Sequence, residues 1–209
     1  KNHGGSDLIR HPQWAIDTIA AAKTAGLAVS VKTRLGYSKL DEFREWLPTL
    51  LRQDIDVLTV HLRTKQEMSK VPAHLELIDD LIKLRDELAP NTLLQVNGDI
   101  PDYQAGLALA KKHPGLDGIM IGRGVFASPF AFEPQPQTHS LAELLELLRF
   151  QLDLFDDFAS RYDVPRFPSL KRFFKIYARP ELGATELRNA MMDAKSTDEV
   201  RQILNDSPF

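Results

Sequence analysis

Two stretches decide the fold: Val96-Asn-Gly-Asp-Ile100 and Gly118-Ile-Met-Ile-Gly-Arg-Gly-Val125. In the second, a short apolar run ends abruptly at Gly122-Arg123-Gly124, and a segment compatible with a helix follows. Glycines let a backbone approach a ligand closely, and the free N–H groups at the start of a helix favour an anion. Arg123 adds a permanently charged guanidinium that suits a phosphate. Taken alone, the Gly-Arg-Gly triplet is equally compatible with an ordinary turn between a strand and a helix.

The same arrangement occurs three more times earlier in the chain. β-rich, mostly apolar runs end there in polar residues, at Lys32-Thr33-Arg34, His61-Leu62-Arg63-Thr64 and Asn97-Gly98-Asp99. The steps between Lys32, His61, Asn97 and Arg123 are 29, 36 and 26 residues, and each leaves room for one helix and one return strand. This is the period of a βαβ unit, in which ligands bind at the carboxyl ends of the parallel strands. The sequence therefore predicts four parallel strands, buried on both faces, with a binding site at their carboxyl ends.

Helices are predicted between these strands. Apolar side chains at helical spacing predict helices that begin near residues 12, 40, 73 and 101 and end near residues 25, 53, 88 and 112. Four parallel βα units are half of an eight-unit barrel. A Pro/Gln-rich segment at residues 133–139 can neither pack well nor continue a helix, and the pattern beyond it is helical only. We therefore predict an α/β fold: residues 1–132 form the second half of a (β/α)8 TIM barrel, residues 133–139 a linker, and residues 140–209 a small all-α helical domain.

The helical domain carries its positive charge unevenly. Ser140 with Glu143 predicts a capping box that opens a long helix ending near Arg161. From Arg161 to Arg179 there are six basic residues and one acidic residue, with aromatic residues among them. Such a segment attracts a phosphate backbone and offers rings that stack on bases. The alternative is a helix with an aromatic core face and a solvated basic face.

The composition excludes several classes of protein. Of the 209 residues, 43% are hydrophobic and 26% charged, and no apolar stretch approaches the roughly 20 residues that a membrane span requires. Cysteine is absent, which excludes disulfides, thiolate metal sites and a cysteine nucleophile within this chain, and a reducing cytoplasm is the expected compartment. The net charge of −3 gives no global nucleic-acid signature. The histidines show no metal-ligand spacing. Five of them are predicted to lie at the surface: His3, His11, His74, His113 and His139.

The motifs resemble, in order and spacing, the second half of the tRNA-dihydrouridine synthases. The resemblance rests on four segments: Lys32-Thr-Arg-Leu-Gly36, His61-Leu-Arg-Thr64, Asn97-Gly-Asp-Ile100 and Gly118-Ile-Met-Ile-Gly-Arg-Gly124. In addition, Asn2-His-Gly-Gly5 resembles the segment after that family's catalytic cysteine, and Leu170-Lys-Arg-Phe-Phe-Lys175 resembles the lysine-rich helix of its tRNA-binding domain. The resemblance implies an FMN-dependent barrel that uses NADPH to reduce uridine in tRNA to 5,6-dihydrouridine.

The resemblance also implies roles for individual residues. Lys32 is expected to contact the flavin ring near N1 and O2, where a cation stabilises negative charge on the reduced ring. His61 is expected to contact the ribityl chain or the phosphate. The other residues expected to bind the cofactor are Asn97, Gly98, Asp99, Gly122 and Arg123. The residues expected to bind RNA are Arg34, Arg63, Lys65, Lys171, Arg172 and Lys175.

The chain departs from the family pattern in one respect. The family's general acid is a cysteine in the first half of the barrel, and this chain contains neither that cysteine nor the first four strands. A half-barrel exposes two strand edges and an apolar interior, so we expect the missing half or self-association to cover them. The chain is then a fragment of a full enzyme, the ordered part of a longer chain, or a half-length product that pairs with itself or another chain. In each case we expect no reductase activity from this piece alone.

Two other functions stay open on the sequence. One is an FMN barrel oxidoreductase that acts on a free pyrimidine, although such an enzyme would not need the basic helical domain. The other is a non-catalytic RNA-binding module that uses the half-barrel as a scaffold.

Overall fold

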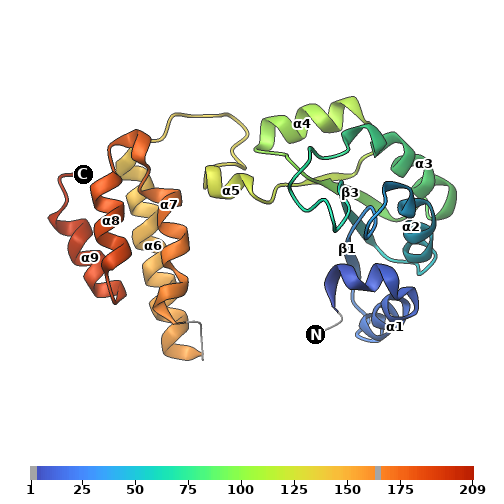
Figure 1. Cartoon of the computed structure of the whole chain (residues 1–209), viewed down its shortest axis with the longest axis horizontal. Helices are drawn as coiled ribbons and strands as arrows, with labels where there is room; N and C mark the ends of the chain where they lie inside the picture. The colour runs from blue at the N-terminus through green and yellow to red at the C-terminus, as the bar shows by residue number, and fades with distance from the viewer. Residues whose placement is uncertain (1–3, 163–165) are drawn as a thin grey trace. The chain divides into compact units, whose positions relative to one another are not determined.

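The computed structural model describes residues 4–162 and 166–209 (Figure 1). The contacts within the chain divide it into two compact units. The first contains Lys1–Val125 and Ala131–Pro134, and the second contains Phe126–Phe130 and Gln135–Phe209. Each unit has a hydrophobic core of its own.

Strands and helices alternate along the first unit, as the sequence predicts. The strands are β1 (Ser30–Arg34), β2 (Val57–His61), β3 (Leu93–Asn97) and β4 (Gly118–Met120). The helices are α1 (Pro12–Lys23), α2 (Phe43–Leu51), α3 (Ile78–Leu88) and α4 (Tyr103–Lys112), with 3-10 turns η1 (Gly5–Arg10), η2 (Leu40–Glu42) and η3 (Leu75–Leu77). The four strands form one parallel sheet in the order β1-β2-β3-β4. An α/β fold with a parallel sheet is therefore confirmed, and its strand order is consistent with part of a (β/α)8 barrel.

The register of β1 differs from the sequence prediction. Lys32 was expected at the carboxyl end of its strand, level with His61, but β1 continues to Arg34. Arg34 is the residue that pairs with His61, and Lys32 pairs with Thr59 two residues earlier. The prediction failed because the end of an apolar run marks where burial ends, whereas the end of a strand depends on hydrogen bonds to its neighbour.

The two faces of the sheet differ in polarity. The packed face consists of side chains that are at most 1% exposed: Leu58, Val60, Leu94 and Val96. They form one core with apolar residues of α1, α2 and α3, the helices that follow one another around the sheet in Figure 1. The opposite face carries Lys32, Thr59 and Gln95, and the Thr59 hydroxyl donates to the Gln95 side chain at 3.1 Å. The strands were predicted to be buried on both faces. The second face is polar instead, and it is buried only in part: Thr59 is 1% exposed, whereas Lys32 is exposed.

The amino-terminal edge of the sheet is tied together by carboxylates that precede the strands. The Asp56 carboxylate accepts the backbone N–H of Val29 at 2.6 Å, and the Asp117 carboxylate accepts that of Leu94 at 2.7 Å. Asp117 also accepts a hydrogen bond from the buried Arg85 of α3. Arg85 donates further to the carbonyls of residues 92 and 115, both at 2.8 Å. Each carboxylate satisfies backbone groups that would otherwise be left without partners at this edge.

Two predicted helices are shorter in the structure. The helix expected from residue 73 begins with the 3-10 turn η3 and becomes α-helical only at Ile78, so Ala73 and His74 belong to the preceding loop. The helix expected after Gly124 is the single turn α5 (Gly124–Ala127). Tertiary contacts of the loop, described below, explain the first difference.

In its described residues, the second unit contains helices and no strand. Its helices are α6 (Leu141–Arg161), α7 (Phe174–Tyr177), α8 (Thr185–Asp193) and α9 (Thr197–Asp206), with 3-10 turns η4 (Phe167–Ser169), η5 (Lys171–Phe173) and η6 (Pro180–Leu182). The predicted capping box is confirmed, because the Ser140 hydroxyl accepts the Glu143 N–H at 3.2 Å and the Glu143 carboxylate accepts the Ser140 N–H at 2.7 Å. No helix in the described ranges is long and apolar enough to cross a membrane.

Candidate functional site

Three of the predicted site residues lie in one row at the carboxyl ends of the strands. Arg34, His61 and Asn97 are consecutive register partners on β1, β2 and β3. Side chains alternate between the two faces of a strand, so Lys32 shares their face, opposite the helix-packed core. The row therefore places cationic and hydrogen-bonding groups side by side at the edge where parallel α/β folds bind ligands.

His61 lies in a strongly cationic environment. Burial, and next the charges of Arg34, Lys32 and Arg63, lower the pKa of His61 to about 4. The imidazole is therefore neutral at physiological pH and can both donate and accept a hydrogen bond. Its Nδ1 atom is buried and has no hydrogen-bond partner in the described structure. A buried polar atom without a partner is costly, so a hydrogen bond between this atom and a ligand would be favourable.

The cations beside His61 are only partly balanced. Burial, followed by the charge of Arg34, lowers the pKa of Lys32. Arg34 Nη1 donates to the Thr64 carbonyl at 3.0 Å, which fixes its position without neutralising its charge. Burial and the nearby Arg63 also lower the pKa of Arg34. In both cases repulsion from a neighbouring cation contributes to the lowered pKa. A bound anion would relieve this repulsion.

Arg63 does not lie where the sequence suggested. We predicted that it faces RNA, but the residue is only 2% exposed. Its Nε donates to the Val71 carbonyl at 2.6 Å, and its Nη2 is paired with the Asp99 carboxylate. The prediction failed because a basic residue after a strand was assumed to reach solvent, whereas the loop folds back over it. Its Nη1 atom is buried and, within the described residues, has no partner.

Asp99 links Arg63 to Arg123, which follows β4. Its backbone is left-handed, with φ of +51°, directly after Gly98 with φ of +137°. The carboxylate accepts the Ala73 N–H at 2.9 Å as well as the Arg63 guanidinium, and its other oxygen accepts Arg123 Nη2 at 2.9 Å. The hydrogen bond from Arg63 is the main reason why the pKa of Asp99 is lowered. The carboxylate is therefore ionised and bridges two arginines.

Asn97, Gly98 and Gly122 complete this edge. The Asn97 side-chain amide donates to the Met120 carbonyl at 2.6 Å and so joins the ends of β3 and β4. A Cβ on Gly98 would lie 2.9 Å from that of Ala73, so this glycine allows the loop after β2 to pack closely. A Cβ on Gly122 would meet only the Asn97 amide, at 3.6 Å, which leaves space beside it.

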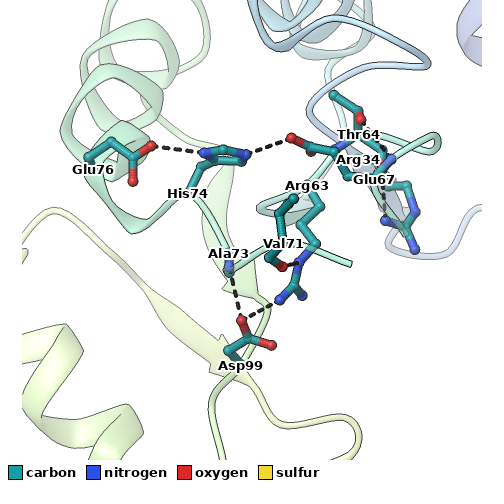
Figure 2. Close-up of polar contacts among 9 residues, drawn as sticks. All are labelled: Arg34, Arg63, Thr64, Glu67, Val71, Ala73, His74, Glu76 and Asp99. Carbon is teal, nitrogen blue, oxygen red and sulfur yellow. Dashed lines mark hydrogen bonds and ion pairs between the residues drawn. The ribbon is translucent and has the colours of Figure 1, made fainter. Parts of the chain in front are cut away.

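The loop after β2 contributes residues that the sequence analysis missed (Figure 2). Glu67 accepts the Thr64 N–H at 2.7 Å and contacts His74 Nε2 at 2.8 Å, while His74 Nδ1 contacts Glu76 at 2.9 Å. These bonds hold the loop that carries Arg63 and the Thr64 carbonyl. Glu67 and His74 lie seven residues apart in an irregular segment, so no periodic signal in the sequence reveals their contact.

Lys65, which was predicted to bind RNA, remains partly accessible beside Tyr37. Its Nζ atom lies 5.2 Å from the centre of the Tyr37 ring, and the Arg10 guanidinium lies 4.2 Å from the same ring. Cation–π contacts of this kind restrain long basic side chains without removing their charge.

In the second unit the three predicted RNA-binding residues differ in their surroundings. Lys171 Nζ donates to the Met192 carbonyl at 2.6 Å. Arg172 lies over the Phe173 ring, 4.6 Å from its centre, and is exposed, as is Lys175. Arg172 and Lys175 are therefore the two that offer their charge to a ligand.

The predicted surface position is wrong for His113 and for most of the His74 and His139 side chains, and the His139 side chain is only 14% exposed. His113 is 5% exposed and its Nδ1 contacts Asp79 at 2.6 Å, while the His74 side chain is 19% exposed. His113 and His74 were misplaced because a carboxylate in contact with the imidazole allows a histidine to be buried, and neither the Asp79 nor the Glu67 contact was predicted. His3 and the Asn2 end of the Asn2-His-Gly-Gly5 motif lie outside the described residues.

Comparison with known proteins is consistent with this arrangement. The family model described as dihydrouridine synthase (Dus) matches residues 1–207. The probable tRNA-dihydrouridine synthase 2 of Bacillus subtilis (strain 168) is 60% identical over 98% of the chain. Probable tRNA-dihydrouridine synthases of Staphylococcus epidermidis (strain ATCC 12228) and Staphylococcus aureus (strain MRSA252) are 55% and 53% identical over 98% and 99% of it. The chain spans 62% of the length of each of these relatives. The match over nearly all residues shows that the chain belongs to the dihydrouridine synthase family.

Proposed function

We propose that this chain is the cofactor-phosphate and RNA-binding part of an FMN-dependent tRNA-dihydrouridine synthase. The reaction adds a hydride and a proton across the C5–C6 double bond of a uridine in tRNA, and NADPH is oxidised to NADP⁺. The observation that carries the proposal is the cationic row at the carboxyl ends of the strands, together with two buried atoms that have no partner in the described structure: His61 Nδ1 in the row and Arg63 Nη1 in the loop after β2.

The residues present fit a phosphorylated flavin. The net positive charge of the row suits a phosphate, and the space beside Gly122 admits a ligand close to the backbone. FMN, when bound, supplies the two-electron carrier between the nicotinamide and the uracil ring. Lys32 would stabilise negative charge on the flavin ring from the polar face of the sheet, while His61, Asn97 and Arg123 would hold its ribityl phosphate.

We further propose that the sheet is the second half of a (β/α)8 barrel. The strand order and the single helix-packed face support this, because every strand of such a barrel is covered by helices on its outer side only. The first half, or a second copy of the chain, would then complete the polar interior. The chain has no cysteine to act as the general acid, so we expect that these 209 residues do not catalyse the reaction alone.

The second unit supports RNA over a free pyrimidine as the substrate. Arg172 and Lys175 are exposed, whereas the aromatic rings of the same segment belong to the core of the unit or pack against it. The segment therefore offers positive charge to a phosphate backbone, and its rings stabilise the fold. A small-molecule substrate would not require this surface. Arg34 and Lys65 at the strand ends would contact the same RNA near the reacting uridine.

The test uses the protein in the form that its gene encodes. The purified protein should carry a yellow chromophore with the absorption of oxidised flavin, and it should convert uridine to dihydrouridine in unmodified tRNA with NADPH. Lys32→Met should lower the rate of flavin reduction by NADPH, whereas Lys39→Met, at an exposed position near the same strand end, should not. A protein that binds no flavin and leaves tRNA unchanged would refute the proposal.

A further inference from the structure

Every oxygen of the Asp99 carboxylate already has a protein partner. One oxygen accepts the Ala73 N–H at 2.9 Å together with the Arg63 guanidinium, as Figure 2 shows, and the other accepts Arg123 Nη2 at 2.9 Å. Its left-handed backbone, with φ of +51°, directs the side chain between the two arginines. An ionised carboxylate has no proton to donate, and a phosphate oxygen is an acceptor too, so Asp99 cannot form a hydrogen bond with a phosphate oxygen.

The two arginines that pair with Asp99 differ in exposure and in the number of contacts that fix their side chains. The Arg63 side chain is 3% exposed and has a second anchor in the Val71 carbonyl, so it is fixed without help from Asp99. The Arg123 side chain is 67% exposed, and within the described residues Asp99 is the ion-pair partner of its guanidinium. A free arginine side chain loses rotamer entropy when a ligand orders it. Asp99 therefore orders Arg123 before any ligand arrives.

The charge of this group also favours an anion. A lone carboxylate next to a phosphate would repel it, but Asp99 between two arginines leaves a group with a net charge of one positive unit. Arg123 Nη2 is taken by Asp99, and the rest of its planar guanidinium remains available for a phosphate oxygen.

We propose that Asp99 is a positioning residue that holds the Arg123 guanidinium for the phosphate of FMN and does not itself bind the cofactor. The inference rests on the proposed function and adds a role that differs from the direct contact expected from the sequence. It predicts that Asp99 contributes to binding through the phosphate alone.

Asp99→Asn is the informative variant. Asparagine has the same shape and tolerates a left-handed backbone as well as aspartate does, so the turn is preserved. One side-chain oxygen can still accept from Ala73 and Arg63, while the amide N–H₂ then faces Arg123 and cannot pair with it. The variant therefore releases Arg123 and leaves Arg63 anchored at Val71.

The experiment compares dissociation constants for FMN and for riboflavin, which lacks the phosphate, in the protein as its gene encodes it and stripped of flavin. Asp99→Asn should weaken FMN binding about five- to tenfold, as expected for one charge-assisted contact, and change riboflavin binding less than about twofold. Arg123→Gln should have the same selective effect. In an Arg123→Gln background, Asp99→Asn should cause no further loss, since the two residues act through one contact.

A matched control is Asp102→Asn, which alters a carboxylate three residues away that caps α4 through the Ala105 N–H. Asparagine is an equally good N-cap, so neither affinity should change. If Asp99→Asn does not fold, Asp99→Glu keeps the charge but moves it, and it should lower the ratio of FMN to riboflavin affinity in the same direction.

Three results would overturn the inference. Tighter FMN binding by Asp99→Asn would mean that the carboxylate repels the phosphate. Equal losses for FMN and riboflavin would mean a purely structural role. Equal affinity of the unaltered protein for the two flavins would mean that it does not recognise the phosphate. A protein that binds neither flavin refutes the proposed function itself, and this outcome is distinguishable from the other three.

Discussion

Arg85 and Arg63 are both buried arginines, and they lie at opposite edges of the same sheet. At the amino-terminal edge, all three nitrogens of the Arg85 guanidinium have acceptors, provided by Asp86, Asp117 and two backbone carbonyls. At the carboxyl edge, Arg63 has acceptors for Nε and Nη2 but none for its buried Nη1 among the described residues. The two arginines are buried to a similar degree, but the hydrogen bonds of Arg85 are all satisfied and those of Arg63 are not.

The difference supports the proposed binding site at the carboxyl edge and assigns a stabilising role to the amino-terminal edge. A buried charge stabilises a fold only when its hydrogen bonds are satisfied, and the Arg85 network meets this condition. An incomplete network is costly unless a ligand supplies the missing partner. In parallel α/β barrels the amino-terminal edge serves stability and the carboxyl edge serves catalysis. The two arginines follow this division.

The largest expected effect comes from removing each arginine in turn. Arg85→Met should lower the free energy of unfolding by about 3–5 kcal/mol, because it leaves Asp117 and two carbonyls without their buried donor. Arg63→Met should cost less, about 1–3 kcal/mol, because Asp99 keeps Arg123 and Ala73 as partners. Urea denaturation measures both.

The control is Lys83→Met on the same helix as Arg85, where the side chain is 76% exposed. It should change the free energy of unfolding by less than about 0.5 kcal/mol. If both arginine variants lowered the free energy of unfolding equally, the proposed difference between the two edges would be wrong, because the carboxyl edge would stabilise the fold as strongly as the amino-terminal edge.

A smaller effect is expected from two glycines that lie two residues apart at the carboxyl edge. A Cβ on Gly124 would lie 2.0 Å from the Pro101 carbonyl oxygen, so Gly124→Ala should destabilise the fold by about 1–3 kcal/mol. Gly122→Ala meets only the Asn97 amide at 3.6 Å and should leave the stability unchanged, but its methyl group should weaken FMN binding. Thermal unfolding and a flavin titration separate the two outcomes. If Gly122→Ala binds FMN normally, the phosphate does not lie beside this residue.

The smallest effect is a dependence on pH that only the carboxyl edge should show. Burial by itself lowers the pKa of His74, but the hydrogen bonds to Glu67 and Glu76 outweigh it, and the pKa is raised above its usual value of 6.5. A histidine with a raised pKa stabilises the fold fully below pH 6.5, and its contribution is lost as the pH rises through the folded-state pKa. His61, whose pKa is lowered to about 4, has the opposite effect, but its contribution is nearly complete above pH 7. Between pH 7 and pH 9 the unaltered protein should therefore lose stability, by less than about 1 kcal/mol.

The matched variant is His74→Gln, which should remove this dependence. The Arg85 network contains no group that titrates in this range, since the pKa of Asp117 is lowered and that of Arg85 is raised. A titration of the His74 imidazole by NMR that gives a pKa below 6.5 would contradict the prediction.

The sequence alone determined the order of strands and helices, the capping box of α6 and the edge at which the polar residues collect. These features follow from periodicity and from pairs of residues three or four positions apart, and both are local signals that can be recognised in the sequence. The polar ends of the strands were visible for the same reason, since each follows directly after an apolar run.

Only the tertiary structure decided how these residues meet. Arg34, and not Lys32, is level with His61, because hydrogen bonds between strands set the register. Arg63 is buried because its partner Asp99 lies 36 residues further along the chain. Asp99 and Arg123, both expected to touch the cofactor, are bonded to each other. Contacts between residues so far apart in sequence leave no local pattern, and for this reason the roles of these side chains could be argued only from the folded chain.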